Sequence, residues 1–185
     1  MKRTFQEDLD RAVAFHGHVC GGQVIGTRMA RLGLAHFGIE SPEDYKDLVI
    51  CVEADRCLAD ALTIVANCSL GRRRLKWYDY GKMAATFYDL QSGKAIRIAS
   101  VNQSRPGPDD TDIVAFYNAI SDEQMFKIEE VEVNLTKLDL PGKPQNRVTC
   151  ARCGEDVLDG REVVKDGQTL CKPCAGEPAY YHTVD

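Results

Sequence analysis

The chain has 185 residues, of which 44% are hydrophobic and 28% are charged, and its formal net charge is -5 at pH 7. This length allows one hydrophobic core with a small additional module, and it excludes a large multidomain enzyme. The acidic balance argues against a protein that binds nucleic acid through positive charge spread over the whole chain.

Helices and strands are both expected in the first 143 residues, where the spacing of apolar residues changes between helical and strand periodicity. Thr4 and Glu7 have the spacing of a capping box, Asp55 is the expected cap of a later helix, and a turn at residues 91–93 joins two strands. The expected helices cover residues 4–15, 23–37, 56–68 and 109–120, and the expected strands cover residues 48–52, 83–90, 94–101 and 125–135. The pattern predicts an α+β fold with a mixed sheet and packed helices.

A segment rich in proline and glycine at residues 141–146 predicts a domain boundary. We assign residues 1–143 to an α+β core domain and residues 147–185 to a small four-cysteine module of the zinc-ribbon or treble-clef kind. The module has five basic and seven acidic residues, so its charge does not favour nucleic acid as a partner.

Eight cysteines stand out in this composition, and their placement decides their role. The N-terminus has no apolar run of signal-peptide length, because Glu7, Asp8 and Asp10 follow its basic residues. No stretch approaches the roughly 18–20 apolar residues that span a bilayer. We therefore expect a cytoplasmic protein without a membrane segment, whose reduced thiols serve metal binding or catalysis.

Two C-x-x-C knuckles, Cys150 with Cys153 and Cys171 with Cys174, are separated by 17 residues, a spacing typical of a four-cysteine zinc site. Four thiolates close a tetrahedral shell around the ion, so this zinc is structural. The module has too few apolar residues for a metal-free core, and the metal replaces that core. The alternatives are a rubredoxin-like iron site, a thioredoxin-like dithiol and two local disulfides.

A second group of ligand-type residues lies near the N-terminus, where His16, His18 and Cys20 fall within five residues. In a helix His16 and Cys20 share a face, whereas in an extended segment all three side chains point the same way. Cys20 precedes the expected start of a helix, where free N–H groups and the helix dipole stabilise a thiolate. Cys20 is therefore a candidate metal ligand or nucleophile. Alternatively, the glycines at 21 and 22 only start a helix, and the histidines are packed or exposed.

Cys57 and Asp60 share one face of the expected helix at 56–68. The strand before this helix brings Cys57 to the edge of a sheet, where sites commonly lie. The alternative is that Cys57 is a small core residue. We assign Cys51 and Cys68 to the core.

A basic segment, Arg72-Arg73-Arg74, lies just before several aromatic residues. It is interpreted either as a solvated turn or as an anion-binding loop near the site.

Four motifs follow one another along the chain: FHGHVCGGQVIGTR, EADRCLADAL, NCSLG and DYGK, with the two knuckles after them. Together they resemble the FmdE family, which takes its name from one of the subunits of formylmethanofuran dehydrogenase. The resemblance implies an α+β core domain with a C-terminal zinc-binding module, and an association with a molybdenum or tungsten enzyme. The motif positions in this chain are His16, His18, Cys20, Cys57, Asp60, Cys68, Gly71, Tyr80, Gly81 and Lys82.

Our first hypothesis for the core is a groove site in which His18, Cys20 and Cys57 hold a second divalent metal, with His16 or Asp60 adding a ligand. Mixed nitrogen and sulfur ligation favours zinc over nickel or iron. Three protein ligands leave a position open for water or a carbonyl, which is compatible with redox or formyl chemistry. The candidate catalytic residues are Cys20, His16, Asp60 and Lys82.

Two other functions fit the same residues. In one, the chain is a non-catalytic subunit whose zinc module docks a redox enzyme. In the other, Cys20 is a metal-free thiolate nucleophile paired with His16 or His18. The expected partners are a redox enzyme, a small-molecule substrate that the sequence does not identify, and a second copy of the chain, since small residues recur from Gly26 to Gly33 on one helix.

Overall fold

The computed structural model of this chain describes residues 1–182 and 184. It divides into two compact units, Met1–Asn134 and Leu135–Asp185. This division falls earlier than the boundary we predicted at 143. Residues 135–143 join the second unit because Leu138 packs against Gly160 and the Asp139 carboxylate pairs with Arg161 at 3.4 Å.

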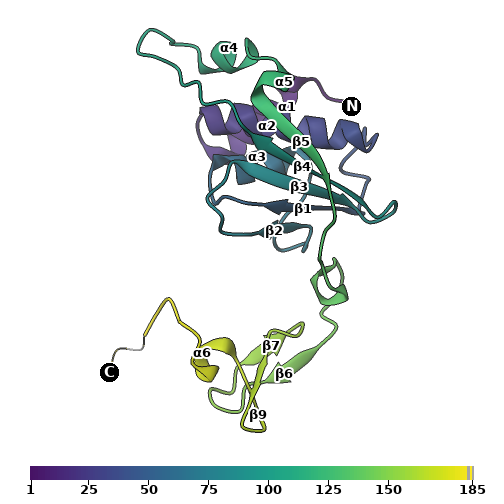
Figure 1. Cartoon of the computed structure of the whole chain (residues 1–185), viewed down its shortest axis with the longest axis vertical. Helices are drawn as coiled ribbons and strands as arrows, with labels where there is room; N and C mark the ends of the chain where they lie inside the picture. Colours follow the sequence, from purple (N-terminus) through teal and green to yellow (C-terminus); the bar gives the residue numbers. More distant parts are fainter. Residues whose placement is uncertain (183, 185) are drawn as a thin grey trace. The chain divides into compact units, whose positions relative to one another are not determined.

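The first unit contains a five-stranded mixed sheet in the order β2-β1-β3-β4-β5, together with several helices (Figure 1). β1 and β2 run parallel, whereas the other neighbouring strands run antiparallel. This confirms the predicted α+β fold with a mixed sheet. Its strands are β1 (Leu48–Val52), β2 (Leu75–Trp77), β3 (Ala84–Asp89), β4 (Lys94–Ser100) and β5 (Phe126–Val131). Its helices are α1 (Phe5–His16), α2 (Gly21–His36), α3 (Cys57–Val65), α4 (Ile113–Asn118) and α5 (Asp122–Met125).

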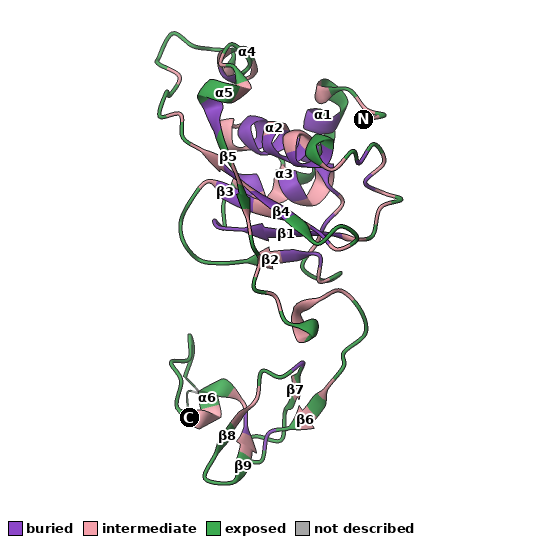
Figure 2. Ribbon diagram, turned by 45° about the vertical axis from the view of Figure 1, so that its right-hand side comes forward, coloured by how far each residue is buried: buried purple, intermediate pink, exposed green. Residues whose placement is uncertain are grey.

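The core lies between the sheet and the helices α1, α2 and α3, which Figures 1 and 2 show on the same side of the strands. Ile50, Phe87 and Ile96 are aligned across β1, β3 and β4, and all three are buried against these helices. None of the helices in the described part of the chain is long and apolar enough to cross a membrane.

Most predicted elements are present, and the differences have local causes. The capping box of Thr4 and Glu7 is confirmed. The predicted Asp55 cap is wrong, because Arg56 occupies the N-cap of α3 and no side chain caps this helix. β2 was not predicted, since three residues are too few to show an alternating pattern. Arg74, next to β2, fits neither interpretation of the basic segment, because it is buried and donates to the carbonyls of Tyr45 and Asn67.

The small residues of α2 allow close packing within the unit. A Cβ on Gly26 would lie 2.7 Å from the Cβ of Ala61 in α3, and a Cβ on Gly33 would lie 2.4 Å from the ring of Phe87 in β3. These glycines therefore serve contacts inside one chain. They no longer support the homodimer that their spacing suggested.

The second unit consists of two hairpins and a short helix. The Asp166-Gly167 turn joins the strands of the second hairpin, and both residues have positive φ, as hairpin turns of this length favour. Among its described residues only Cys150, Asp159 and Leu170 are buried, which is too small a core for stability without a further tie. Its elements are a 3-10 turn at Lys137–Asp139, β6 (Arg147–Thr149), β7 (Asp156–Leu158), β8 (Val163–Lys165), β9 (Gln168–Leu170) and α6 (Lys172–Ala175).

The contact between Gly33 and Phe87 gives a stability prediction for the first unit. Gly33→Val should destabilise it by about 1–3 kcal/mol, because the added side chain overlaps a fully buried ring. Urea unfolding followed by the fluorescence of Trp77, the single tryptophan of the chain, measures this. The control is Gly71→Val, at an exposed position with no neighbouring atom within 4 Å, where the change should stay within about 0.5 kcal/mol. Equal midpoints for both variants would contradict the close packing of α2 on β3.

Candidate metal centres

The first candidate centre forms where three helix ends meet. α1 ends at His16 because Gly17 takes a left-handed conformation with φ 95°. Cys20 is the extended N-cap residue of α2, and Cys57 is the first residue of α3. Because α1, α2 and α3 pack against one another, these ends bring residues that are distant in sequence to one place.

His16, Cys20 and Cys57 form a compact set of ligand-type atoms. One nitrogen of His16 and the two sulfurs lie within 4.8 Å of one another, and all three residues are half-buried. The Nε2 atom of His16 lies 3.9 Å from Sγ of Cys20. Ligands of a tetrahedral zinc ion are separated by about 3.5–3.8 Å, as follows from its bond lengths. The set therefore needs only a small contraction to hold such an ion.

Asp60 orients the imidazole of His16. The Nδ1 atom of His16 lies 2.8 Å from Oδ2 of Asp60, one turn along α3 from Cys57. When the carboxylate accepts the Nδ1 proton, the Nε2 lone pair faces the sulfur of Cys20. A carboxylate behind a histidine is the usual arrangement that fixes a metal-binding imidazole.

His18, a predicted ligand, lies outside the three-residue set. It is exposed, and its ring is stacked at a tilt beside that of His16, with centroids 4.6 Å apart. His16 takes the place expected for His18, because the left-handed turn at Gly17 sends the following residues outward. Lys82 is also exposed and does not line the cavity beside the set.

The electrostatics of the two thiols suit a cation. Burial, followed by contact with the Cys20 thiol, raises the pKa of the Cys57 thiol. Two neighbouring thiolates repel each other, and a metal ion removes this repulsion by binding both. The buried Cys68 differs, because it lies in the core away from other thiols, and burial raises its pKa to about 11. Cys51 is likewise buried, within β1.

A cavity of about 470 Å³ opens beside this set, at the carboxyl ends of the parallel strands β1 and β2. His16, Cys57 and Asp60 line one part of it. Leu70, Leu75 and Trp77 give it an apolar wall. Asp55 and Arg56 also line it, and neither side chain has an ion-pair or hydrogen-bond partner among the described residues. The cavity therefore offers apolar surface and both charge signs next to a candidate metal centre.

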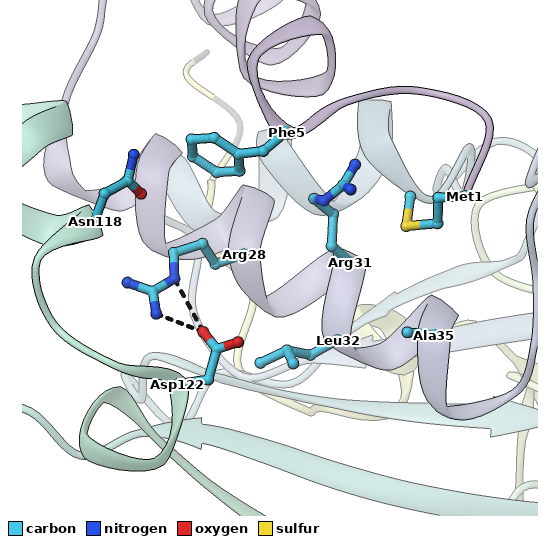
Figure 3. A pocket seen from close by; sticks show the side chains of 8 residues that line it. All are labelled: Met1, Phe5, Arg28, Arg31, Leu32, Ala35, Asn118 and Asp122. Carbon is cyan, nitrogen blue, oxygen red and sulfur yellow. Dashed lines mark hydrogen bonds and ion pairs between the residues drawn. The ribbon is translucent and has the colours of Figure 1, made fainter.

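Another cavity, of about 510 Å³, lies between α1, α2 and the segment of α4 and α5 (Figure 3). Its arginines are already engaged. Arg28 donates from Nε to Asp122 at 3.1 Å and also binds the carbonyl of Tyr117, while Arg31 binds the buried Asp8. The contacts of Arg28 tie α4 and α5 to α2, and the contact of Arg31 ties α1 to α2, so both arginines serve packing within the unit.

The second candidate centre contains the four cysteines of the C-terminal knuckles, whose sulfurs lie within 4.8 Å of one another. Backbone N–H groups of Cys153 and Cys171 lower the pKa of Cys150 to about 6. The thiol of Cys171 raises the pKa of Cys174 to about 12. Without a cation the four sulfurs thus resist carrying four charges together, and zinc relieves this by binding all of them.

Comparison with known sequences identifies the family and supports the second centre. A family profile described as FmdE, molybdenum formylmethanofuran dehydrogenase operon, matches residues 15–135. The chain belongs to the FmdE family. The profile of the prokaryotic dksA/traR C4-type zinc finger matches residues 146–178 of this FmdE protein, which supports the predicted structural zinc.

Two relatives place this FmdE protein among known proteins. A curated protein of Archaeoglobus fulgidus, named a probable S-adenosyl-L-methionine-binding protein, is 28% identical over 95% of this chain. The match covers 54% of that protein, so the chain spans about half the length of this relative. The crystal structure of an FmdE-like protein from Syntrophus aciditrophicus, named after tungsten formylmethanofuran dehydrogenase, shares the fold, with a TM-score of 0.59 and 23% identity. This match covers 94% of our chain and 93% of that one.

The zinc module gives a prediction in which the second unit is affected and the first is not. Cys171→Ser should remove one equivalent of zinc and unfold the second unit, because the small module depends on the metal for its core. The fluorescence of Trp77, in the first unit, should stay unchanged. Zinc analysis and circular dichroism measure the two effects. Cys68→Ala, which removes a buried thiol outside both sets, is the control and should keep all zinc. Full zinc in Cys171→Ser would exclude the four-cysteine site.

Proposed function

We propose that the FmdE core binds a divalent metal through His16, Cys20 and Cys57 and acts on a small molecule held in the adjacent cavity. The observation that carries this is the meeting of one imidazole and two thiols within 4.8 Å, at a cavity of about 470 Å³. One nitrogen and two sulfur ligands suit zinc better than nickel or iron.

The metal would supply an electrophilic position, because three protein ligands leave one coordination site open. The residues around this metal would have different roles. Cys20 and Cys57 contribute negative charge, and Asp60 holds His16 in the tautomer that presents Nε2. His18, beside the ring of His16, is placed to add a ligand or accept a proton from the bound molecule.

The cavity wall indicates how the small molecule is held. Leu70, Leu75 and Trp77 offer apolar contacts to a bound molecule, while Arg56 and Asp55 are available to charged groups. Lys82 is exposed and lies outside this wall, so we give it no part in the proposed reaction. Redox or formyl chemistry remains the reaction class that we propose, in association with an enzyme of the kind encoded in the formylmethanofuran dehydrogenase operon.

Metal analysis of the full chain, purified without oxygen, tests this function. We expect two metals per chain, of which Cys57→Ser loses one and Cys171→Ser loses the other. Asp60→Ala should lower the affinity for the core metal by about 10–100-fold without changing the stoichiometry at saturation, because it removes the group that orients His16. Asp55→Ala, at the same cavity but without contact to a ligand, is the matched control. A natural chain that holds only one metal, or a Cys57→Ser variant that holds as much metal as the natural chain, would refute the core site.

A metal-free thiolate enzyme is the competing interpretation, and one observation favours it. Cys20, His16 and Asp60 form a line in which the carboxylate orients the imidazole toward the sulfur, as in catalytic triads. The thiol of Cys57, the second thiol of the set, has no role in such a triad. Alkylation of Cys20 that zinc does not slow would favour the triad, whereas protection by zinc favours the metal site.

A non-catalytic docking subunit is the other alternative. Val164 and Tyr180 of the second unit are largely exposed, which leaves apolar surface for a partner. If this is the main function, Cys171→Ser abolishes capture of a redox enzyme from native lysate and Cys57→Ser has no effect on the activity of the captured enzyme. Loss of that activity in Cys57→Ser favours the metal site.

The relative from Archaeoglobus fulgidus suggests which small molecule to test first. That protein is named as binding S-adenosyl-L-methionine. This molecule carries a flat ring, a cationic sulfonium and an amino-acid end with both charges. The cavity offers Trp77 for stacking, Asp55 for the cationic groups and Arg56 for the carboxylate.

Titration of the full chain with S-adenosyl-L-methionine, followed by Trp77 fluorescence, measures this binding directly. We expect a saturable change, with affinity reduced about ten-fold or more in Arg56→Ala because a charge-assisted hydrogen bond is lost. Lys94→Ala, which removes a positive charge at the start of β4, is the control. A signal that does not saturate, or that is the same in Arg56→Ala, would exclude this ligand from the cavity.

A further inference from the structure

A separate cavity of about 550 Å³ lies at the N-terminus of α2. Gly21 and Gly22, the first residues of α2, form part of its wall, and Tyr117 of α4 and the loop after β4 form other parts. No ligand was expected here from the sequence. The residues that line the cavity include Asn102, Gln103 and Arg105 of that loop.

The helix end presents donors to this cavity. The N–H groups of the first residues of a helix have no acceptor within the helix. α2 has 16 residues, and the side chain of its N-cap residue Cys20 makes no capping hydrogen bond. The N–H groups of Gly21 and Gly22 and the positive end of the helix dipole are therefore available to an anion.

Tyr117 is the second, independent indication of a ligand. Its residue is only 5% exposed, yet its hydroxyl has no hydrogen-bond partner among the described residues. The hydroxyl lies 2.8 Å from the position of a Cβ on Gly21, so only glycine there allows the phenol to reach the helix end. Tyr117 lines the cavity, so a ligand bound there could accept the hydrogen bond that this hydroxyl does not make to any described residue.

The position of Tyr117 is stabilised by Arg28 of α2. Arg28 of α2 donates to the backbone carbonyl of Tyr117 and, through Nε, to the carboxylate of Asp122 at 3.1 Å. Figure 3 shows the guanidinium of Arg28 joined to Asp122 by both of its contacts. These contacts hold the backbone of α4 at Tyr117 beside α2 and do not involve the phenol hydroxyl.

The charge around the cavity has one sign. Arg105 lines it and donates only to the carbonyl of its neighbour Ser104, without a carboxylate partner among the described residues. No aspartate or glutamate among the described residues lines the cavity. The donors and the charge therefore favour a negatively charged group.

We propose that this cavity binds an oxyanion, the carboxylate or phosphate of a small molecule, between the Tyr117 hydroxyl, the N–H groups of Gly21 and Gly22, and Arg105. These groups can all donate hydrogen bonds, and Arg105 adds a positive charge, which together complement an oxyanion. The site does not require the metal proposed at His16, Cys20 and Cys57.

The test uses the full chain labelled with ¹⁵N-glycine and titrated in parallel with inorganic phosphate, acetate and chloride at constant ionic strength. We expect the amide signals of Gly21 and Gly22 to shift and saturate with phosphate or acetate, and not with chloride, while Gly93 in the β3–β4 turn stays unchanged. The probe that binds identifies the shape of the oxyanion, tetrahedral or planar.

Tyr117→Phe keeps the ring and removes only the hydroxyl, so it should fold normally and bind the probe about ten-fold more weakly. Arg105→Ala, on an exposed loop, should also weaken binding, and Tyr88→Phe is the matched control in β3. His16→Ala should bind the probe as the natural chain does, which separates this site from the metal site. Shifts that do not saturate, that chloride reproduces, or that persist unchanged in both Tyr117→Phe and Arg105→Ala would overturn the proposal.

Discussion

The approach of α2 to α3 is the contact on which the arrangement of the core depends. Gly22 lies against Cys57, where an added Cβ would be 2.8 Å from the Cβ of the cysteine, and Gly26 lies against Ala61. Larger side chains at these two positions would push the helices apart and separate Cys20 from Cys57. The same approach fixes the start of α2, and with it the N–H groups that face Tyr117. Close packing through glycine therefore links the fold to both proposed sites.

The cysteines of the chain serve different physical purposes according to their surroundings. Those of the knuckles replace a hydrophobic core that the second unit is too small to form. In the first unit the core is already sufficient, because three helices cover one face of a five-stranded sheet. The metal that we propose at Cys20 and Cys57 would therefore not be needed for folding there, and its open position would be available for chemistry.

The two cavities beside the core site differ in the chemistry of the residues that line them. The one at the carboxyl ends of β1 and β2 combines the apolar wall around Trp77 with both charge signs. The one at the start of α2 offers donors and a positive charge. Cys20 directly precedes the glycines of the second cavity, while His16 and Cys57 line the first. A molecule bound in either cavity thus meets residues adjacent to the proposed metal.

The sequence by itself determined the family, the α+β class and the four-cysteine zinc site, because these depend on local spacing: two knuckles, a capping box and motifs of a few residues. It also selected Cys20, Cys57 and Asp60. Only the tertiary structure decided that His16 rather than His18 joins the thiols, because one left-handed glycine sets the direction of the chain after α1. It alone revealed the wall at Trp77 and the free hydroxyl of Tyr117, since these side chains reach their sites through strand pairing and helix packing that no local pattern encodes.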